Sequence, residues 1–176
     1  ELIEAAAELL REGGPASVSM RNVAGRVGSS LSATTYYFAN ADELLEAAGR
    51  VNIALWAERA EGVAEAAEAT PTPRDTTAAI DLILNATLPK DSPLLGHYSQ
   101  LIAAGTSLPV ARAYNTGRDR LNLALGRVLR VVQINLPAEL VISVVDGAAV
   151  SALSEGRDVR KTARRYLAEL LDLASK

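Results

Sequence analysis

Few side chains in this sequence could carry out catalytic or metal-binding chemistry. The 176 residues include no cysteine and a single histidine, His97. A thiolate nucleophile, a disulfide framework and a zinc site built on cysteines or several histidines are therefore excluded. A hydrolase or lyase would have to use His97 with Asp91 or Asp119, and no sequence motif supports either pair. We expect no enzyme activity, no metal and no cofactor.

Residues suited to contact nucleic acid gather near the start of the chain. Residues 13–41 contain no acidic side chain, and Arg21 and Arg26 are their only charges. Within this window, residues 30–37 are small, hydroxyl-bearing or aromatic, except for Leu31. A helix that enters the major groove of DNA needs such a face, because carboxylates would be repelled by the phosphates. The window therefore predicts a DNA-binding surface.

Helices must position these residues, because the composition favours helix throughout. Hydrophobic residues make up 49% of the chain but aromatic residues only 4%, so the apolar content is mainly alanine, leucine and valine. Periodicity and breaks predict an all-α fold of about nine helices and no strand. The expected helices cover residues 2–12, 20–27, 31–37, 41–69, 75–88, 92–104, 109–134, 138–154 and 158–174.

The ends of the short helices carry recognisable signals. Ser19, Ser30 and Asn40 stand where helix N-caps are expected, and Gly28 stands just after the second helix, where a left-handed residue is favoured. The order of helix, glycine-containing turn and helix is that of a helix-turn-helix. No apolar run approaches the ~20 residues that cross a bilayer, so we expect a cytoplasmic protein without a membrane partner.

Residues 19–45, SMRNVAGRVGSSLSATTYYFANADELL, resemble the DNA-binding domain of the tetracycline-repressor (TetR) family of bacterial transcription regulators. The resemblance covers the first 45 residues without a gap. Its features are the glycine that ends the first helix, a small polar residue, a basic residue, an aromatic pair before a core ring, and an acid before two leucines. They stand at Gly14, Ser19, Arg21, Ala24, Val27, Gly28, Ser30, Tyr36, Tyr37, Phe38 and Glu43 to Leu45.

The resemblance implies a set of DNA contacts. Leu31, Ser32 and Ala33 match positions that touch base edges, whereas Thr35, Tyr36 and Tyr37 match positions that meet the DNA backbone. Arg21 matches a position that reaches phosphate or guanine, and hydroxyl contacts are expected from Ser19 and Ser30, which could equally be helix caps only. Phe38 is expected in the core and Arg26 in solvent.

The sequence also departs from the family pattern. Many members carry lysine where this chain has Ala41, and Thr34 and Thr35 replace a more usual Leu-Tyr. The net charge is −3, and residues 1–50 hold only four basic side chains. Modest nonspecific DNA affinity is therefore expected.

Two functional domains are expected, residues 1–46 for DNA binding and residues 47–176 for effector binding and dimerisation. Small and apolar residues on the last two helices predict a two-fold homodimer interface, and hence a palindromic operator in double-stranded DNA. The expected interface residues are Val144, Gly147, Ala148, Ser151, Val159, Ala163, Leu167, Leu170 and Leu171. The alternative is that these stripes form only the internal core of the domain.

Polar and aromatic residues at apolar helical positions suggest a cavity for a small organic effector. They are Asn52, Trp56, Asn85, His97, Tyr98, Gln100 and Tyr114. Taken singly, His97 is more often a structural histidine and Trp56 more often a core residue. If the set converges, the cavity would suit a neutral or weakly charged molecule.

The sequence thus predicts a homodimeric DNA-binding transcription regulator, a repressor that a small molecule releases from its operator. The alternative is a helical protein-interaction module of the same fold without DNA binding, which the sparse basic charge favours. An all-α enzyme is the third reading.

Overall fold

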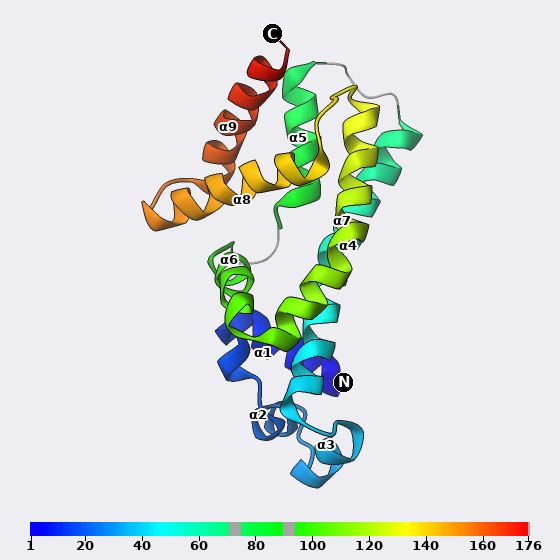
Figure 1. Ribbon diagram of the computed structural model, residues 1–176, viewed down its shortest axis with the longest axis vertical. Helices are drawn as coiled ribbons and strands as arrows, with labels where there is room; N and C mark the ends of the chain where they lie inside the picture. Colours follow the sequence, from blue (N-terminus) through cyan, green and yellow to red (C-terminus); the bar gives the residue numbers. More distant parts are fainter. Residues whose placement is uncertain (71–74, 90–93, 176) are drawn as a thin grey trace. The chain divides into compact units, whose positions relative to one another are not determined.

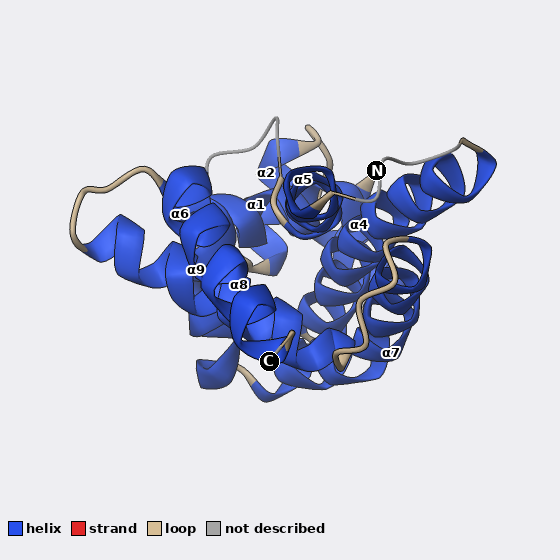
Figure 2. Ribbon diagram, turned by 90° about the horizontal axis from the view of Figure 1, so that it is seen from above, coloured by secondary structure: helices blue, strands red, loops and turns tan. Residues whose placement is uncertain are grey.

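The computed structural model describes residues 1–70, 75–89 and 94–175, and every regular element among them is helical (Figures 1 and 2). The helices are α1 (Leu2–Gly13), η1 (Pro15–Ser17), α2 (Met20–Arg26), α3 (Leu31–Tyr37), α4 (Ala41–Ala69), α5 (Thr76–Thr87), α6 (Leu94–Ala103), η2 (Ala104–Thr106), α7 (Leu108–Val131), α8 (Ala138–Ser154) and α9 (Val159–Ala174). The prediction of an all-α fold with nine α-helices is confirmed for the described residues.

The chain packs as two compact units. The first comprises Glu1–Leu55 and Leu95–Arg118, and the second comprises Trp56–Leu94 and Asp119–Lys176. Helices α4 and α7 each contribute one part to each unit. The expected boundary between a DNA-binding domain and an effector-binding domain, after residue 46, concerns function rather than packing and stays a prediction.

Local capping explains why the short helices of the first unit form. The side-chain oxygens of Ser19 and Ser30 accept hydrogen bonds from the backbone N–H groups of Asn22 and Ala33. Asn40 likewise accepts from the N–H of Glu43 at 2.9 Å, at the start of α4. These bonds satisfy donors that a helix leaves unpaired in its first turn. All three predicted N-caps are confirmed.

The turn between α2 and α3 needs its glycine. Gly28 has a φ of +65°, in the left-handed region. The N–H of Ser29 donates to the carbonyl of Ala24 at 2.9 Å, which closes the end of α2. This arrangement orients α3 after only two turns of α2 and confirms the expected role of Gly28.

The end of α7 differs from the expectation. The periodicity predicts a helix from Pro109 to Ile134, but α7 begins at Leu108 and ends at Val131. Gln133 adopts a left-handed φ of 59°, and the N–H of Ile134 donates to the carbonyl of Leu129. The apolar pattern continues through the turn because Ile134 is half-buried, so periodicity alone overruns the helix end.

Glycines set the crossing of α4 and α7 in the first unit. A Cβ atom added to Gly117 would lie 2.4 Å from Cγ2 of Ile53, and one on Gly49 would lie 2.9 Å from Cβ of Ala113. Such short distances mean that the two backbones could not approach this closely if either position carried a side chain. Within the first unit, α4 and α7 therefore form a tight helix pair.

The second unit is built on α5, α8 and α9, with the second parts of α4 and α7. Val145 and Ala149 of α8, Leu167 of α9 and Ile83 of α5 are all fully buried. Arg120 and Arg127 of α7 pair with Glu61 and Glu68 of α4, each with two short bonds of 2.6–3.0 Å. Asp158 caps α9 by accepting from the N–H of Lys161.

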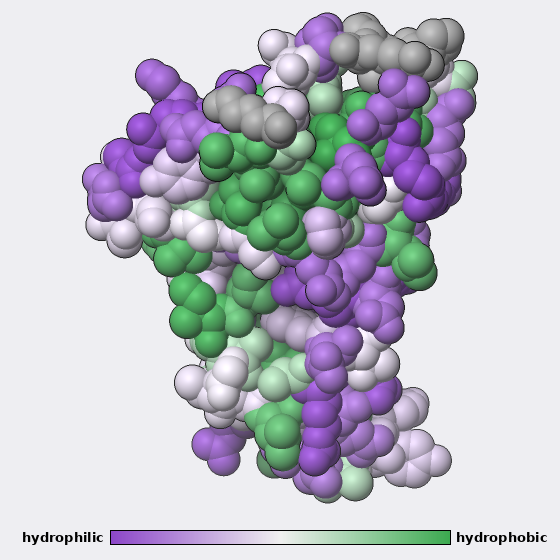
Figure 3. All heavy atoms as spheres, turned by 45° about the horizontal axis from the view of Figure 1, so that its top comes forward, coloured by the Kyte–Doolittle hydropathy of each residue, from purple (hydrophilic) through white to green (hydrophobic). Residues whose placement is uncertain are grey.

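The surface mixes charged residues with exposed apolar ones, as the face in Figure 3 shows. Large exposed apolar side chains include Leu95, Ile102 and Leu108, each more than 60% exposed. A helix long and apolar enough to span a membrane does not occur in the described ranges.

Candidate nucleic-acid interface

Helix α3 presents to solvent most of the residues expected to contact DNA. Tyr36 is 84% exposed, Tyr37 67% and Leu31 46%. Ser30, Ser32 and Thr35 are also exposed, whereas Ala33 is half-buried. Rings this exposed contribute little to the core of the single chain, so they are available for contact with a partner.

The inner side of α3 anchors it to the first unit. Thr34 is fully buried and its hydroxyl donates to the carbonyl of Ser30 at 3.4 Å. Phe38, directly after the helix, is buried as expected. Because these two residues face inward, the opposite face of α3, with Leu31, Ser32, Thr35 and Tyr36, is turned outward.

Hydroxyl groups and rings on α3 are ordered by short contacts. The hydroxyl oxygens of Ser30 and Ser32 are 3.0 Å apart, and the hydroxyl of Thr35 donates to the carbonyl of Ser32 at 3.0 Å. The rings of Tyr36 and Tyr37 meet edge to face with centroids 5.3 Å apart. The helix therefore offers hydroxyl and aromatic groups in a fixed arrangement.

Arg21 and Arg26 of α2 differ in their availability. Arg21 is exposed and has no hydrogen bond or ion pair within the described ranges. Arg26 is bound to two acids of α1, to Glu12 at 2.7 Å and to Glu8 at 3.3 Å. Its hydrogen bond to Glu12 raises the pKa of Arg26 and lowers the pKa of Glu12. The charge of Arg26 is thus already paired with acidic side chains of the same chain.

The other two basic residues of the first fifty are also engaged. Arg11 donates to the side chain of Asn52 at 2.5 Å, and Arg50 pairs with Glu46 one helical turn earlier. Arg21 is therefore the one basic side chain among residues 1–50, all of them described, without an internal partner.

Three of the expected effector residues come together in the first unit. The side-chain amide of Asn52 donates to Oε1 of Gln100 at 3.0 Å, and the hydroxyl of Tyr114 donates to the same oxygen at 3.1 Å. All three side chains are buried. Burial raises the pKa of Tyr114 to about 12. Their polar groups already bind one another, and Arg11, which the sequence did not indicate, completes the cluster.

The remaining expected effector residues are placed separately. His97 and Tyr98 are buried neighbours in the first unit, with rings 4.8 Å apart and nearly perpendicular. Trp56 is buried in the second unit. Asn85, half-buried in the same unit, accepts a long hydrogen bond of 3.4 Å from Arg160. Asp91, named for the enzyme reading, lies outside the described residues, as does the start expected for α6 at residue 92.

The expected dimer residues divide into two groups in the structure. Ala148, Val159, Ala163 and Leu167 are buried within the single chain. Val144, Ser151, Leu170 and Leu171 are half-buried and Gly147 is exposed. The second group, rather than the first, is therefore accessible on the surface of the second unit.

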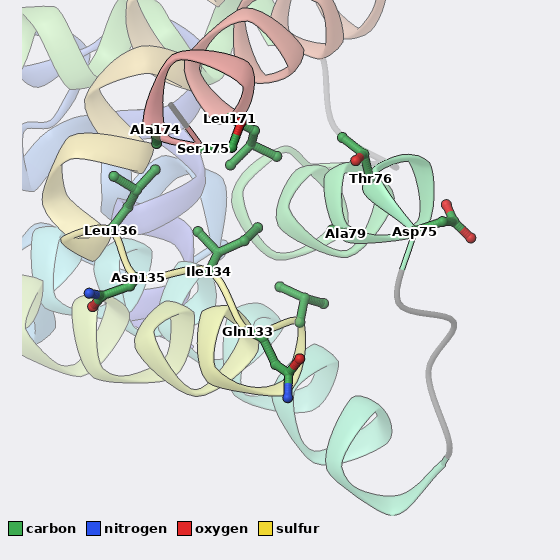
Figure 4. Close-up of a pocket in the computed structure, with 11 residues that line it drawn as sticks. Asp75, Thr76, Ala79, Gln133, Ile134, Asn135, Leu136, Leu171, Ala174 and Ser175 are labelled. Carbon is green, nitrogen blue, oxygen red and sulfur yellow. The ribbon is translucent and has the colours of Figure 1, made fainter.

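An open cleft of about 420 Å³ lies in the second unit, between the start of α5, the segment after α7 and the end of α9 (Figure 4). Ile134, Leu136 and Leu171 point toward its interior, whereas the carboxylate of Asp75 points away. The cleft contains none of the expected effector residues. In the part of the chain that the structure describes, no cluster of three histidine or acidic residues could hold a metal ion.

Sequence comparison identifies the first helices. Residues 2–48 match the family described as "Bacterial regulatory proteins, tetR family". This range contains α1, α2, α3 and the start of α4, with every residue expected to contact DNA. No curated protein sequence matches the chain.

Solved structures share the fold over nearly the whole chain. A protein from Saccharomonospora viridis, described as a transcriptional regulator in complex with choline, has a TM-score of 0.71 and 20% identity, over 97% of this chain and 93% of that one. A TetR transcription regulator from Haloarcula marismortui has a TM-score of 0.70 and 22% identity, over 98% and 95%. The multidrug binding protein EbrR, complexed with ethidium, has a TM-score of 0.62 and 22% identity, over 96% and 95%.

Proposed function

We propose that this chain is a repressor, because its residues 2–48 match the tetR family of bacterial regulatory proteins and its fold is shared with solved structures of transcription regulators. In this proposal the protein binds a palindromic operator as a homodimer and leaves it when a small organic molecule binds residues 47–176. The observation that carries the proposal is the exposed face of α3 with the free Arg21 beside it.

The chemistry of α3 fits the contacts that DNA offers. Leu31 and Ala33 suit the methyl group of thymine, and the Ser32 hydroxyl suits a base edge of either kind. Thr35, Tyr36 and Tyr37 carry hydroxyls that reach phosphate oxygens from an exposed helix face. Arg21 supplies a charge that no internal acid neutralises, so it is available for phosphate or guanine.

A homodimer is supported by the accessible face of α8. Five exposed residues recur at helical spacing on it without any charge: Leu140, Ser143, Gly147, Val150 and Ser154. A Cβ atom at Gly147 would meet nothing within 4 Å, so there is room for a second backbone to approach. Two-fold pairing of this face would present two α3 helices to two halves of a palindrome.

A small organic effector is supported by the neighbours of the same fold. One of them is described in complex with choline and another in complex with ethidium. In this chain, buried polar residues of α4, α6 and α7 occupy the region proposed for the effector. Both features favour a ligand-controlled regulator over an enzyme.

The alternative is a helical protein-interaction module that does not bind DNA. It is favoured by the internal pairing of Arg11, Arg26 and Arg50, which leaves few cations for phosphate. The two readings differ in one property, because only the regulator should prefer one DNA sequence over another.

Gel-shift titration of the protein with the intergenic DNA next to its own gene separates the two. The regulator predicts a discrete complex that survives an excess of unrelated duplex. A complex that the unrelated duplex removes completely, or no complex at all, would favour the interaction module.

A further inference from the structure

A buried hydrogen-bond network joins four helices of the first unit. Arg11 of α1 donates to Oδ1 of Asn52 on α4 at 2.5 Å, and the amide nitrogen of Asn52 donates to Gln100 of α6 at 3.0 Å. Tyr114 of α7 donates to the same oxygen of Gln100 at 3.1 Å. The Asn52 amide also lies 3.3 Å from the carbonyl of Ala7 on α1. Gln100 is thus the point where α6 and α7 reach α1 through one intermediate residue.

The network is sensitive to the loss of any one member, because its central residues are shielded from water. Asn52 and Gln100 are 0% and 2% exposed. When one partner leaves such a network, the other polar groups cannot turn to water and remain unsatisfied. The network is therefore expected to be either complete or rearranged as a whole, rather than gradually loosened.

Backbone contacts add to the connection between α1 and α6. A Cβ atom on Gly96 would lie 3.2 Å from the carbonyl oxygen of Arg11. At the other end of α6, a Cβ atom on Gly14 would lie 3.6 Å from Cβ of Ala103. Helix α6 thus meets the end of α1 at two places along its length, in agreement with their proximity in Figure 1.

The position of α1 matters to the DNA-binding helices. Glu8 and Glu12 of α1 hold Arg26 of α2, and the hydroxyl of Ser17, between the two helices, donates to the carbonyl of Leu9 at 2.6 Å. Helix α2 in turn packs on α3. A displacement of α1 would therefore displace the surface that carries Arg21 and Tyr36.

We propose that Gln100 and Arg11 are positioning residues for operator binding, which transmit the placement of α6 and α7 to α1 through Asn52. The connection is separate from the continuous helix α4, because it enters the DNA-binding helices through α1. The proposal rests on the proposed function for its effect on DNA, but not for its effect on α1.

Three residues predicted to bind an effector, Asn52, Gln100 and Tyr114, thus hydrogen-bond to one another. A molecule that displaces α6 or draws away the Tyr114 hydroxyl breaks the network without touching Arg11. Operator binding then weakens because α1 loses its fixed partner. By reciprocity, operator DNA favours the complete network.

The test uses the full chain with Gln100→Leu, which keeps the volume but removes the shared acceptor, and with Gln100→Glu, which keeps an acceptor. Ser99→Ala, at an exposed position of the same helix, is the matched control. Hydrogen exchange of the α1 amides is measured without DNA, and operator affinity is measured at a temperature where circular dichroism shows every variant folded. Tyr114→Phe, which leaves the bond between Asn52 and Gln100, is the second variant if Gln100→Leu does not fold.

We expect Gln100→Leu to speed exchange at residues 8–13 by about tenfold or more and to weaken operator binding by about fivefold or more. Gln100→Glu should restore most of both, and Ser99→Ala should change neither. Arg11→Met added to Gln100→Leu should weaken operator binding no further, because both changes break one connection. For Tyr114→Phe we expect effects in the same direction but smaller.

Two results would overturn the proposal. The first is a hydrogen-exchange rate of the α1 amides in Gln100→Leu that equals the rate in the parent. If Tyr114→Phe replaces that variant, the same comparison applies to it. The other is an independent, additive loss of affinity from Arg11→Met. A parent protein that binds no DNA would count against the proposed function alone, and the exchange rates would then decide whether the network positions α1.

Discussion

At the scale of single residues, the structure separates two arginines that the sequence places five positions apart. Arg21 points to solvent without an internal partner, whereas Arg26 is bound by Glu8 and Glu12. Each removal changes the net charge by the same amount. Their different surroundings therefore make them a matched pair for testing the proposed DNA-binding surface.

Arg21→Ala should weaken operator binding by about 1–3 kcal/mol and reduce the salt dependence of binding by about one released ion. Arg26→Ala should change the salt dependence much less, because its charge is already paired within the protein. Fluorescence anisotropy titrations of labelled operator at several salt concentrations give both quantities. Equal effects of the two variants would place the DNA on another face.

Tyr114 gives a prediction about alkaline stability. Burial raises its pKa from 10.0 to about 12, so the folded chain keeps the phenol proton at a pH where the unfolded chain has lost it. Stability from this group is complete below pH 10 and is lost as the pH rises from 10 to 12. The difference amounts to at most about 3 kcal/mol.

Urea unfolding at pH 9 and at pH 11.5 measures this loss. The Tyr114→Phe variant is the control, because it lacks the phenol and should lose less stability over the same interval. In a pH titration followed by absorbance at 295 nm, the parent should show one tyrosine that ionises above pH 10 and that is missing in Tyr114→Phe. A parent and a variant with the same pH dependence would mean that Tyr114 is not buried as described.

Residues whose role depends on their neighbours in the chain are predictable from the sequence. Ser19, Ser30 and Asn40 cap helices because each accepts from an N–H three residues later, and that spacing can be read directly. The contact between Arg11 and Asn52 could not be predicted, because the two lie 41 positions apart in the sequence and arginine is usually exposed. The network was therefore visible only as scattered polar residues.

At the scale of helices, the crossing of α4 and α7 depends on residues with no side chain. Gly117→Ala should destabilise the fold by about 1–3 kcal/mol, because the new Cβ would overlap Ile53. Gly62→Ala, in the same helix pair but with open space around it, should stabilise α4 by about 0.5–1 kcal/mol. Thermal unfolding followed by circular dichroism compares the two, and a neutral Gly117→Ala would contradict the close approach.

Some helix ends are easier to predict from the sequence than others. Gly28 and Gly156 have left-handed φ values and mark their helix ends in the sequence. The end of α7 uses Gln133 for the same conformation, with no glycine to mark it. Because hydrophobic Ile134 continues the pattern, the expected helix ran three residues too far.

At the scale of the whole molecule, the proposed homodimer makes the exposed face of α8 a contact between two chains. Val150→Glu, at a position 38% exposed in the single chain, should give a folded monomer, since a charge would be buried unpaired at the interface. Thr77→Glu, at an exposed position of α5, is the control with the same change in charge. Sedimentation velocity at micromolar concentration reads the result, and a parent that sediments as a monomer would refute the dimer.

The fold of the whole chain was more predictable than its sites. The nine α-helices of the described ranges follow from composition, periodicity and the prolines and glycines that interrupt them, all of which act locally. The dimer face was harder to define, because Ala148 and Leu167 belong to the same apolar stripes as Gly147 and Leu170. Only the packed structure separates the residues that fill the core from those that stay accessible on the surface.

The most direct test of the account is the affinity of the parent protein for a palindromic duplex taken from the DNA next to its own gene, compared with the same duplex after one half-site is scrambled. Anisotropy titration at physiological salt measures both. A regulator predicts binding at least about a thousandfold tighter than to unrelated DNA, with two chains per duplex and a large loss on scrambling. Equal affinity for the intact, scrambled and unrelated duplexes would mean that the protein does not read a DNA sequence.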